Sequence, residues 1–117
     1  MRLGIFARTF PGTTPLAVMG AARQAGFDAV HYNFSCSGLP ALPDRVDAAT
    51  CAAIADAARR TGMTVAGLSG TYNMAHPDPQ VRADGARRLR VVIAAAAEIG
   101  APIVTLCSGT RDAQDQW

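Results

Sequence analysis

Polar side chains that could bind a hydroxylated or anionic ligand gather in four short stretches of the sequence. Arg8 and Thr9 form the first stretch, residues 31–33 the second, residues 72–76 the third and residues 108–112 the fourth. Amides, hydroxyls and imidazoles donate and accept hydrogen bonds, as binding of a sugar or polyol requires. An arginine can bind a phosphate or carboxylate through two parallel hydrogen bonds. The candidate ligand-contacting residues are Arg8, Asn33, Tyr72, Asn73, His76 and Arg111.

Each of these side chains also has a structural interpretation. Asn33 can satisfy backbone groups of its own loop, and Arg8 and Arg111 can form ion pairs with nearby aspartates. His76 lies two residues before an expected helix cap, so a place at the rim of the loop without ligand contact is its alternative. A histidine at this position also suits general acid–base chemistry.

The four polar stretches follow four predicted strands that helices separate. Apolar runs predict strands over residues 3–7, 29–33, 64–69 and 103–107. The first run has no polar alternation, which predicts burial on both faces. Capping residues and terminal glycines predict helices after Thr13 or Thr14, Asp47 and Asp78, ending at Gly26, Gly62 and Gly100. Because ligands gather at the carboxyl ends of parallel strands, the four polar stretches should share one edge of the sheet.

The alternation of strands and helices predicts a parallel α/β sheet with right-handed crossovers. Strand centres near Ile5, Val30, Ala66 and Thr105 match the spacing of a (β/α)8 barrel, in which about 250 residues give about 31 residues per unit. We therefore expect about half of a TIM barrel, with four strands and three helices. A complete open α/β sheet is the alternative. His31, inside a predicted strand, is expected in the barrel interior or facing the helices.

The end of the sequence leads us to expect a truncated domain. No helix follows the fourth strand, and a lone Trp117 comes last after a polar loop. We therefore expect residues 1–117 to be the N-terminal part of a single barrel domain.

The composition argues against several classes of protein. Half of the residues are hydrophobic and 17% are charged, which favours a folded core. The net charge is only +2, and a nucleic-acid partner is not expected. Three cysteines without metal-binding spacing fit a reducing cytosol. No apolar run reaches the roughly 20 residues of a membrane span, and no signal peptide is evident, so a cytoplasmic protein is expected.

No catalytic or metal-ligating residue is predicted within these 117 residues. The sequence contains no paired-carboxylate site, and the motifs of zinc proteases, phosphate-binding loops and nucleophile elbows do not occur in it.

Three motifs give the sequence a family resemblance: GTYNMAHPDP at 70–79, EIGAP at 98–102 and VTLCSGTRD at 104–112. They resemble the xylose-isomerase-like TIM-barrel superfamily, and most closely its sugar phosphate isomerase/epimerases. AARQAGFDAVHYNF at 21–34 fits the same pattern. The resemblance implies a small carbohydrate substrate and proton transfer next to a carbonyl. It also implies a divalent metal, Mn²⁺ or Mg²⁺, whose ligands come from later strands than these four.

The expected function is therefore that of a fragment of a metal-dependent sugar or sugar-phosphate isomerase/epimerase, inactive alone. One alternative is an endonuclease IV-like enzyme that repairs abasic sites in DNA. In that branch of the superfamily a zinc-binding histidine follows the third strand, where this chain has Ser69 and Gly70. The other alternative is a non-catalytic α/β module that forms a homo-oligomer, because a half barrel leaves two strand edges open.

Overall fold

The computed structural model describes residues 1–112 and 114. Its elements are β1 (Gly4–Phe6), the short 3-10 helix η1 (Ala7–Thr9), α1 (Pro15–Gln24), β2 (Ala29–Tyr32), the 3-10 helix η2 (Phe34–Ser37), α2 (Ala48–Thr61), β3 (Thr64–Ser69), α3 (Pro79–Ile99) and β4 (Val104–Thr105). The strands form one sheet in the order β1-β2-β3-β4, and neighbouring strands are parallel. For this part of the chain the predicted fold class is confirmed: α/β, with four parallel strands and three α-helices, as in half of a TIM barrel.

The α-helices begin and end at residues that the sequence indicates. The carboxylates of Asp47 and Asp78 each accept a hydrogen bond from a backbone N–H of the first turn, both at 2.8 Å. The Thr14 hydroxyl caps α1 in the same way. These groups satisfy N–H donors that have no partner inside the helix. Gly62 and Gly100 end α2 and α3 with φ of 69° and 84°, a left-handed conformation that glycine adopts without strain.

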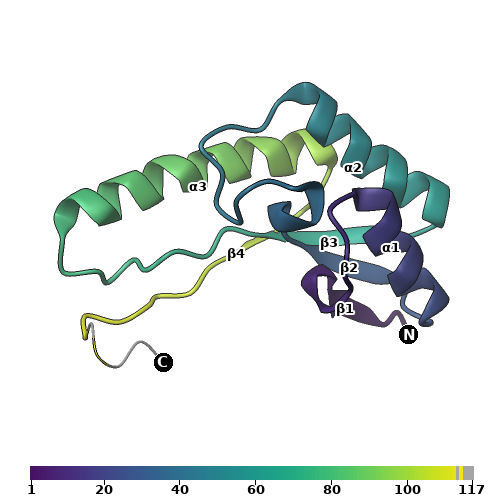
Figure 1. The fold of residues 1–117 in the computed structure, drawn as a ribbon, viewed down its shortest axis with the longest axis horizontal. Coiled ribbons are helices and arrows are strands. Elements are labelled where there is room, and N and C mark those ends of the chain that lie inside the picture. Colours follow the sequence, from purple (N-terminus) through teal and green to yellow (C-terminus); the bar gives the residue numbers. More distant parts are fainter. Residues whose placement is uncertain (113, 115–117) are drawn as a thin grey trace.

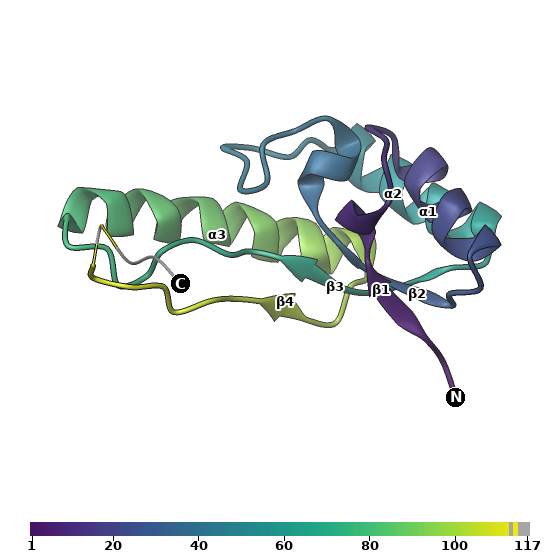
Figure 2. The ribbon, with the colours of Figure 1, turned by 60° about the horizontal axis from the view of Figure 1, so that its bottom comes forward.

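The three α-helices cover one face of the sheet (Figure 1), and Figure 2 shows that they leave its other face uncovered. The core lies between the helices and the covered face. Ten of its residues have no exposed surface: Ala7, Val18, Met19, Ala22, Val30, Tyr32, Phe34, Ile54, Leu68 and Val92. Val30 and Tyr32 both face this core because alternate residues of a strand point to the same side of a sheet.

The uncovered face of the sheet changes one expectation. Strand β1 was expected to be buried on both faces, but Gly4 and Phe6 are exposed and only Ile5 between them is partly buried. The prediction is wrong because nothing in the described part of the chain covers this side of the sheet. Apolar side chains therefore remain in contact with solvent along both edge strands, with Phe6 at 39% and Ile103 at 57% exposure.

Two extended segments continue from β3 and β4 beyond the sheet, and we call residues 70–78 and 106–112 the arm. They run side by side along the N-terminal half of α3 (Figures 1 and 2). The backbone N–H of Gly70 donates to the carbonyl of Thr105, and that of Ala75 donates to the carbonyl of Ser108, both at 3.0 Å. Such isolated bonds do not form a continuous ladder, so β4 covers only Val104–Thr105 and not the predicted residues 103–107.

None of the helices in residues 1–112 combines the length and apolarity needed to cross a membrane.

Candidate functional site

The uncovered face of the sheet carries a polar and aromatic cluster near the carboxyl ends of the strands. His31 lies between Val30 and Tyr32, which both face the helices, so its side chain points to the uncovered face. Its Nε2 is 2.8 Å from the Thr105 hydroxyl on β4, and the two atoms share a hydrogen bond. The ring also packs against Phe6 of β1, with centroids 5.1 Å apart and planes tilted by 31°. Three strands thus contribute to one cluster.

A glycine on the intervening strand makes the bond between His31 and Thr105 possible. Gly67 of β3 is the register partner of His31. A Cβ atom at Gly67 would lie 3.1 Å from the carbonyl oxygen of Ile103 and 3.7 Å from Cδ2 of His31. A side chain there would crowd the space that the imidazole crosses, so the absence of one lets strands β2 and β4 share a side-chain hydrogen bond over β3.

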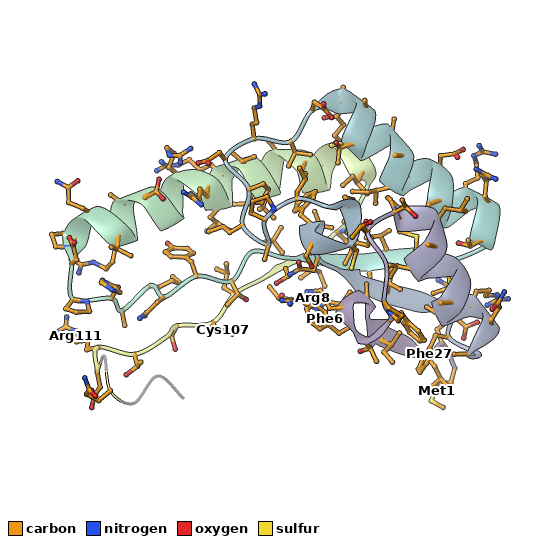
Figure 3. The ribbon with its side chains drawn as sticks, in the orientation of Figure 1. Met1, Phe6, Arg8, Phe27, Cys107 and Arg111 are labelled. Atoms are coloured by element: carbon orange, nitrogen blue, oxygen red, sulfur yellow. The ribbon has the colours of Figure 1, made fainter. Side chains whose placement is uncertain are left out.

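Two of the predicted site residues lie at the carboxyl ends of β1 and β2. Arg8, on η1, is exposed and stands next to Phe6 (Figure 3). Asn33 caps η2: its Oδ1 accepts a hydrogen bond from the Ser35 N–H at 3.0 Å. The residue is only 3% exposed, and no group in residues 1–112 or 114 bonds to its Nδ2. The structure therefore gives the Asn33 carbonyl a loop-building role and leaves its amide donor available.

Three other predicted residues lie on the arm and make contacts within it. Asn73 accepts hydrogen bonds from the N–H groups of Ala75 and Thr110, both at 3.1 Å, and donates to the Thr110 carbonyl at 2.8 Å. His76 Nδ1 accepts from the Asp78 N–H at 3.0 Å. The Tyr72 ring lies against α3. These contacts hold the two segments of the arm together and fix the start of α3.

Arg8 and Arg111 lie in different parts of the molecule. Figure 3 shows Arg8 at the sheet and Arg111 at the far end of the arm. Neither guanidinium forms an ion pair within residues 1–112 and 114. The structure thus separates the six predicted residues into a sheet group, Arg8 and Asn33, and an arm group, Tyr72, Asn73, His76 and Arg111. Contact of these residues with a ligand stays a prediction.

The cluster of His31, Phe6 and Thr105 was not among the predicted contacts. The sequence placed His31 in the barrel interior or against the helices, and the structure places it on the face that corresponds to the interior. One signal could have found the cluster: His31 alternates with the apolar Val30 and Tyr32, and Phe6 and Thr105 lie within two other predicted strands.

Two buried side chains at and after the carboxyl end of β2 have raised pKa values. Burial raises the pKa of the Tyr32 phenol far above its usual range, although the hydroxyl bonds to Ser37 at 2.7 Å. Burial also raises the pKa of the Cys36 thiol, an effect that the backbone hydrogen bond at Asn33 partly offsets. Both groups are therefore neutral near pH 7, and they belong to the packing rather than to proton transfer.

The described residues do not match a metal centre. In residues 1–112 and 114, no group of three or more His, Cys, Asp or Glu side chains is placed to hold a metal ion. The cluster of His31, Phe6 and Thr105 on the uncovered face offers one imidazole and one hydroxyl, which is too few ligands for Mn²⁺ or Mg²⁺. The divalent metal implied by the family resemblance therefore does not fit the side chains that are present here.

The fold and the polar groups at the carboxyl ends of its strands define a partial TIM barrel. A model of the family described as xylose isomerase-like TIM barrel matches residues 19–117, and the chain belongs to this family. No curated protein sequence is significantly similar to the chain.

Solved structures share this fold over nearly the whole chain. A candidate xylose isomerase from Rhodospirillum rubrum has a TM-score of 0.75 at 22% identity, over 98% of this chain and 42% of its own. The 3-keto-D-glucoside 4-epimerase of E. coli has a TM-score of 0.71 at 17% identity, over 93% of this chain and 38% of its own. A fusion of a xylose isomerase-like TIM barrel with a 4-hydroxyphenylpyruvate dioxygenase has a TM-score of 0.65 at 17% identity, over 92% of this chain and 16% of its own. The chain thus spans less than half the length of each of these proteins.

Proposed function

We propose that this chain is the N-terminal, substrate-binding half of a barrel enzyme that isomerises or epimerises a sugar. Family membership and two structural neighbours that are named as a candidate isomerase and an epimerase support this reaction class. One observation carries the proposal for this chain itself: the hydrogen-bonded His31 and Thr105 lie beside an exposed aromatic ring at the carboxyl ends of the strands. That is the end at which TIM-barrel enzymes bind their substrates.

The residues of this chain would bind and orient the substrate. A sugar presents hydroxyl groups, which need donors and acceptors, and C–H faces, which pack on apolar surface. Arg8 stands at the rim, where a guanidinium can bind a phosphate or carboxylate in bidentate fashion. Proton transfer next to the carbonyl requires a positioned base, and in this proposal the base comes from the second half of the barrel.

In this proposal the divalent metal is also bound by the second half of the barrel. A bound Mn²⁺ or Mg²⁺ would polarise the substrate oxygens next to the carbon that exchanges its proton. Its ligands would have to come from strands that follow β4, because residues 1–112 and 114 contain no suitable cluster.

The first test is the coding DNA beyond the codon of Trp117. The proposal predicts a reading frame that continues through four further strand–helix units, with acidic and histidine residues at the strand ends. The continued protein, incubated in D2O with a panel of aldoses and ketoses, should introduce deuterium next to the carbonyl of at least one sugar. Excess EDTA should abolish the exchange, and Mn²⁺ or Mg²⁺ should restore it.

Two results would contradict the proposal. A genuine stop codon directly after Trp117 would remove the half that carries the base and the metal. Full exchange in excess EDTA, with the metal shown to be gone, would rule out the metal-dependent reaction. The same protein should also be tested for cleavage of a DNA duplex that contains an abasic site. Cleavage would favour the DNA-repair alternative over the sugar isomerase or epimerase.

A further inference from the structure

The imidazole of His31 is fixed on one side and free on the other. Its Nε2 shares a hydrogen bond with Thr105, and no group in residues 1–112 or 114 bonds to its Nδ1. A neutral imidazole has one nitrogen that donates and one that accepts. Thr105 therefore determines the hydrogen-bonding role of Nδ1. If the Thr105 hydroxyl donates to Nε2, Nδ1 is a donor, and if the hydroxyl accepts from Nε2, Nδ1 is an acceptor. In either case one defined hydrogen-bonding position remains.

An exposed aromatic ring lies beside this free nitrogen. The Phe6 ring packs against the imidazole at 5.1 Å and is 39% exposed. An exposed aromatic face beside a single polar atom suits a ligand that is apolar on one side and carries a hydroxyl at its edge. The pyranose or furanose ring of a sugar has this character.

We infer that His31 contacts a ring hydroxyl of the sugar through Nδ1, that Phe6 packs against its C–H face, and that Thr105, reached across Gly67, positions the imidazole. The inference rests on the proposed function and names the residues that determine specificity within it. It differs from the prediction made from the sequence, in which His76 on the arm contacts the substrate. Gly67 is part of the arrangement because a side chain at this position would crowd both the imidazole and β4.

The chain contains two histidines, His31 and His76, so each serves as a control for the other. The experiment follows both imidazole rings by NMR while D-xylose, D-glucose or D-fructose is added to the 117-residue chain. At least one sugar should shift the ring signals of His31 saturably and leave those of His76 unchanged. Movement of His76 alone would place the sugar on the arm, and movement of neither ring in the folded chain would exclude binding at the sheet. Both results overturn the inference.

Variants at position 105 test the positioning role. Thr105→Val keeps the branched shape but removes the hydroxyl, so the sugar should bind roughly three- to tenfold more weakly, the effect of one hydrogen bond. Thr105→Ser restores the hydroxyl and should restore binding, which a purely structural role of the β-branch would not predict. Thr71→Val, on the exposed part of the arm, is the matched control and should bind as the original chain does. Equal affinity of Thr105→Val and the original chain would overturn the positioning role.

A kinetic measurement separates this inference from the proposed function. In the continued protein described above, His31→Leu should raise KM for the sugar by about tenfold or more, since it leaves the hydroxyl without a partner. If the protein exchanges deuterium and His31→Leu has unchanged kinetics, the proposed function stands and the inference fails. If no sugar exchanges but the imidazole of His31 still responds to one of them, the reaction is wrong and the binding site stands.

Discussion

Asp28 connects the start of the sheet to the first α-helix through a single carboxylate. Its Oδ2 accepts a hydrogen bond from the Leu3 N–H at 3.2 Å, and its Oδ1 accepts one from Arg23 at 2.9 Å. The backbone hydrogen bond from Leu3 is the largest cause that lowers the pKa of Asp28, and the hydrogen bond from Arg23 comes next. This carboxylate is therefore bound more tightly when ionised than when protonated.

The lowered pKa of Asp28 predicts a component of acid sensitivity. A carboxyl whose pKa is lower in the folded state than in the unfolded state stabilises the protein above the unfolded pKa, which is about 3.9. This stability is lost as the pH falls through the folded pKa. Asp28→Asn should therefore make the free energy of unfolding less dependent on pH below about pH 4, as measured by urea denaturation over a pH series.

Arg23→Gln is the control for this prediction. It removes the cation but keeps the backbone hydrogen bond from Leu3, the largest cause, so part of the lowering of the Asp28 pKa should survive. Its acid dependence should lie between that of Asp28→Asn and that of the original chain. Identical acid dependence of Asp28→Asn and the original chain would show that this carboxylate does not act in this way.

Single residues were predictable where their function is local. Asp47 and Asp78 cap helices as expected because a cap bonds to the turn that directly follows it. The hydrogen bond between His31 and Thr105 joins residues 74 positions apart and exists only because the register places Gly67 between them. The register between strands cannot be read from either strand alone. The sequence therefore indicated that His31 is an interior residue but could not identify Thr105 as its hydrogen-bond partner.

At the scale of the elements, α3 depends on a close contact with the arm. Gly85 is buried in this helix, and a Cβ atom there would lie 2.1 Å from Cδ2 of Tyr72. The ring thus occupies the space that a side chain would need. Apolar residues recur along α3 at a spacing of three or four, but two of them, Val81 and Ile93, are exposed at 44% and 51%. Val81 lies in the first turns of α3, which extend beyond the sheet (Figure 1), and Ile93 is exposed although its neighbour Val92 is buried.

Gly85→Ala should destabilise the chain although alanine favours helices. The gain in helix propensity is about 0.8–1.0 kcal/mol, whereas overpacking of a filled site costs about 1–3 kcal/mol. We expect a net loss of about 1 kcal/mol in urea denaturation. In a Tyr72→Ala background the same substitution should become stabilising, because the ring that it meets is gone.

Gly20→Ala in α1 is the matched control for Gly85→Ala. A Cβ atom at Gly20 would meet nothing within 4 Å, so this variant should gain about 0.5–1 kcal/mol through propensity alone. Stabilisation by both substitutions would show that Tyr72 does not pack on α3 in solution.

At the scale of the whole molecule, the sheet has two free edges and one uncovered face. Strands β1 and β4 each have a neighbour on one side only within the described chain. Exposed apolar side chains accompany these edges: Leu3, Phe6, Ile103 and Leu106. Unpaired edges beside apolar surface favour pairing with another chain. The order of strands and helices was predictable because each strand–helix unit carries its own apolar run, capping residue and terminal glycine. The uncovered face of the sheet was not predictable, because the burial of a strand depends on which other elements pack against it.

The 117-residue chain alone should therefore self-associate. Sedimentation velocity is expected to show dimers or larger species that increase with concentration. Ile103→Lys, which places a charge on an edge, should reduce this association, and Ala53→Lys on the exposed side of α2 should not. A monodisperse monomer that melts cooperatively would contradict the prediction and favour a complete small domain.

The strand order β1-β2-β3-β4 also bears on how the chain is made. Each strand pairs with the strand translated just before it, and the helix between them packs on the same growing sheet. Pairing of successive parallel strands requires closure of the helix-containing connection between them, so it is slower than the formation of local helical contacts. A ribosome releases roughly 5–20 residues per second, so each strand–helix unit can dock on the previous one before the next emerges. During synthesis the growing edge is the newest strand, and the chain passes through a series of progressively wider sheets.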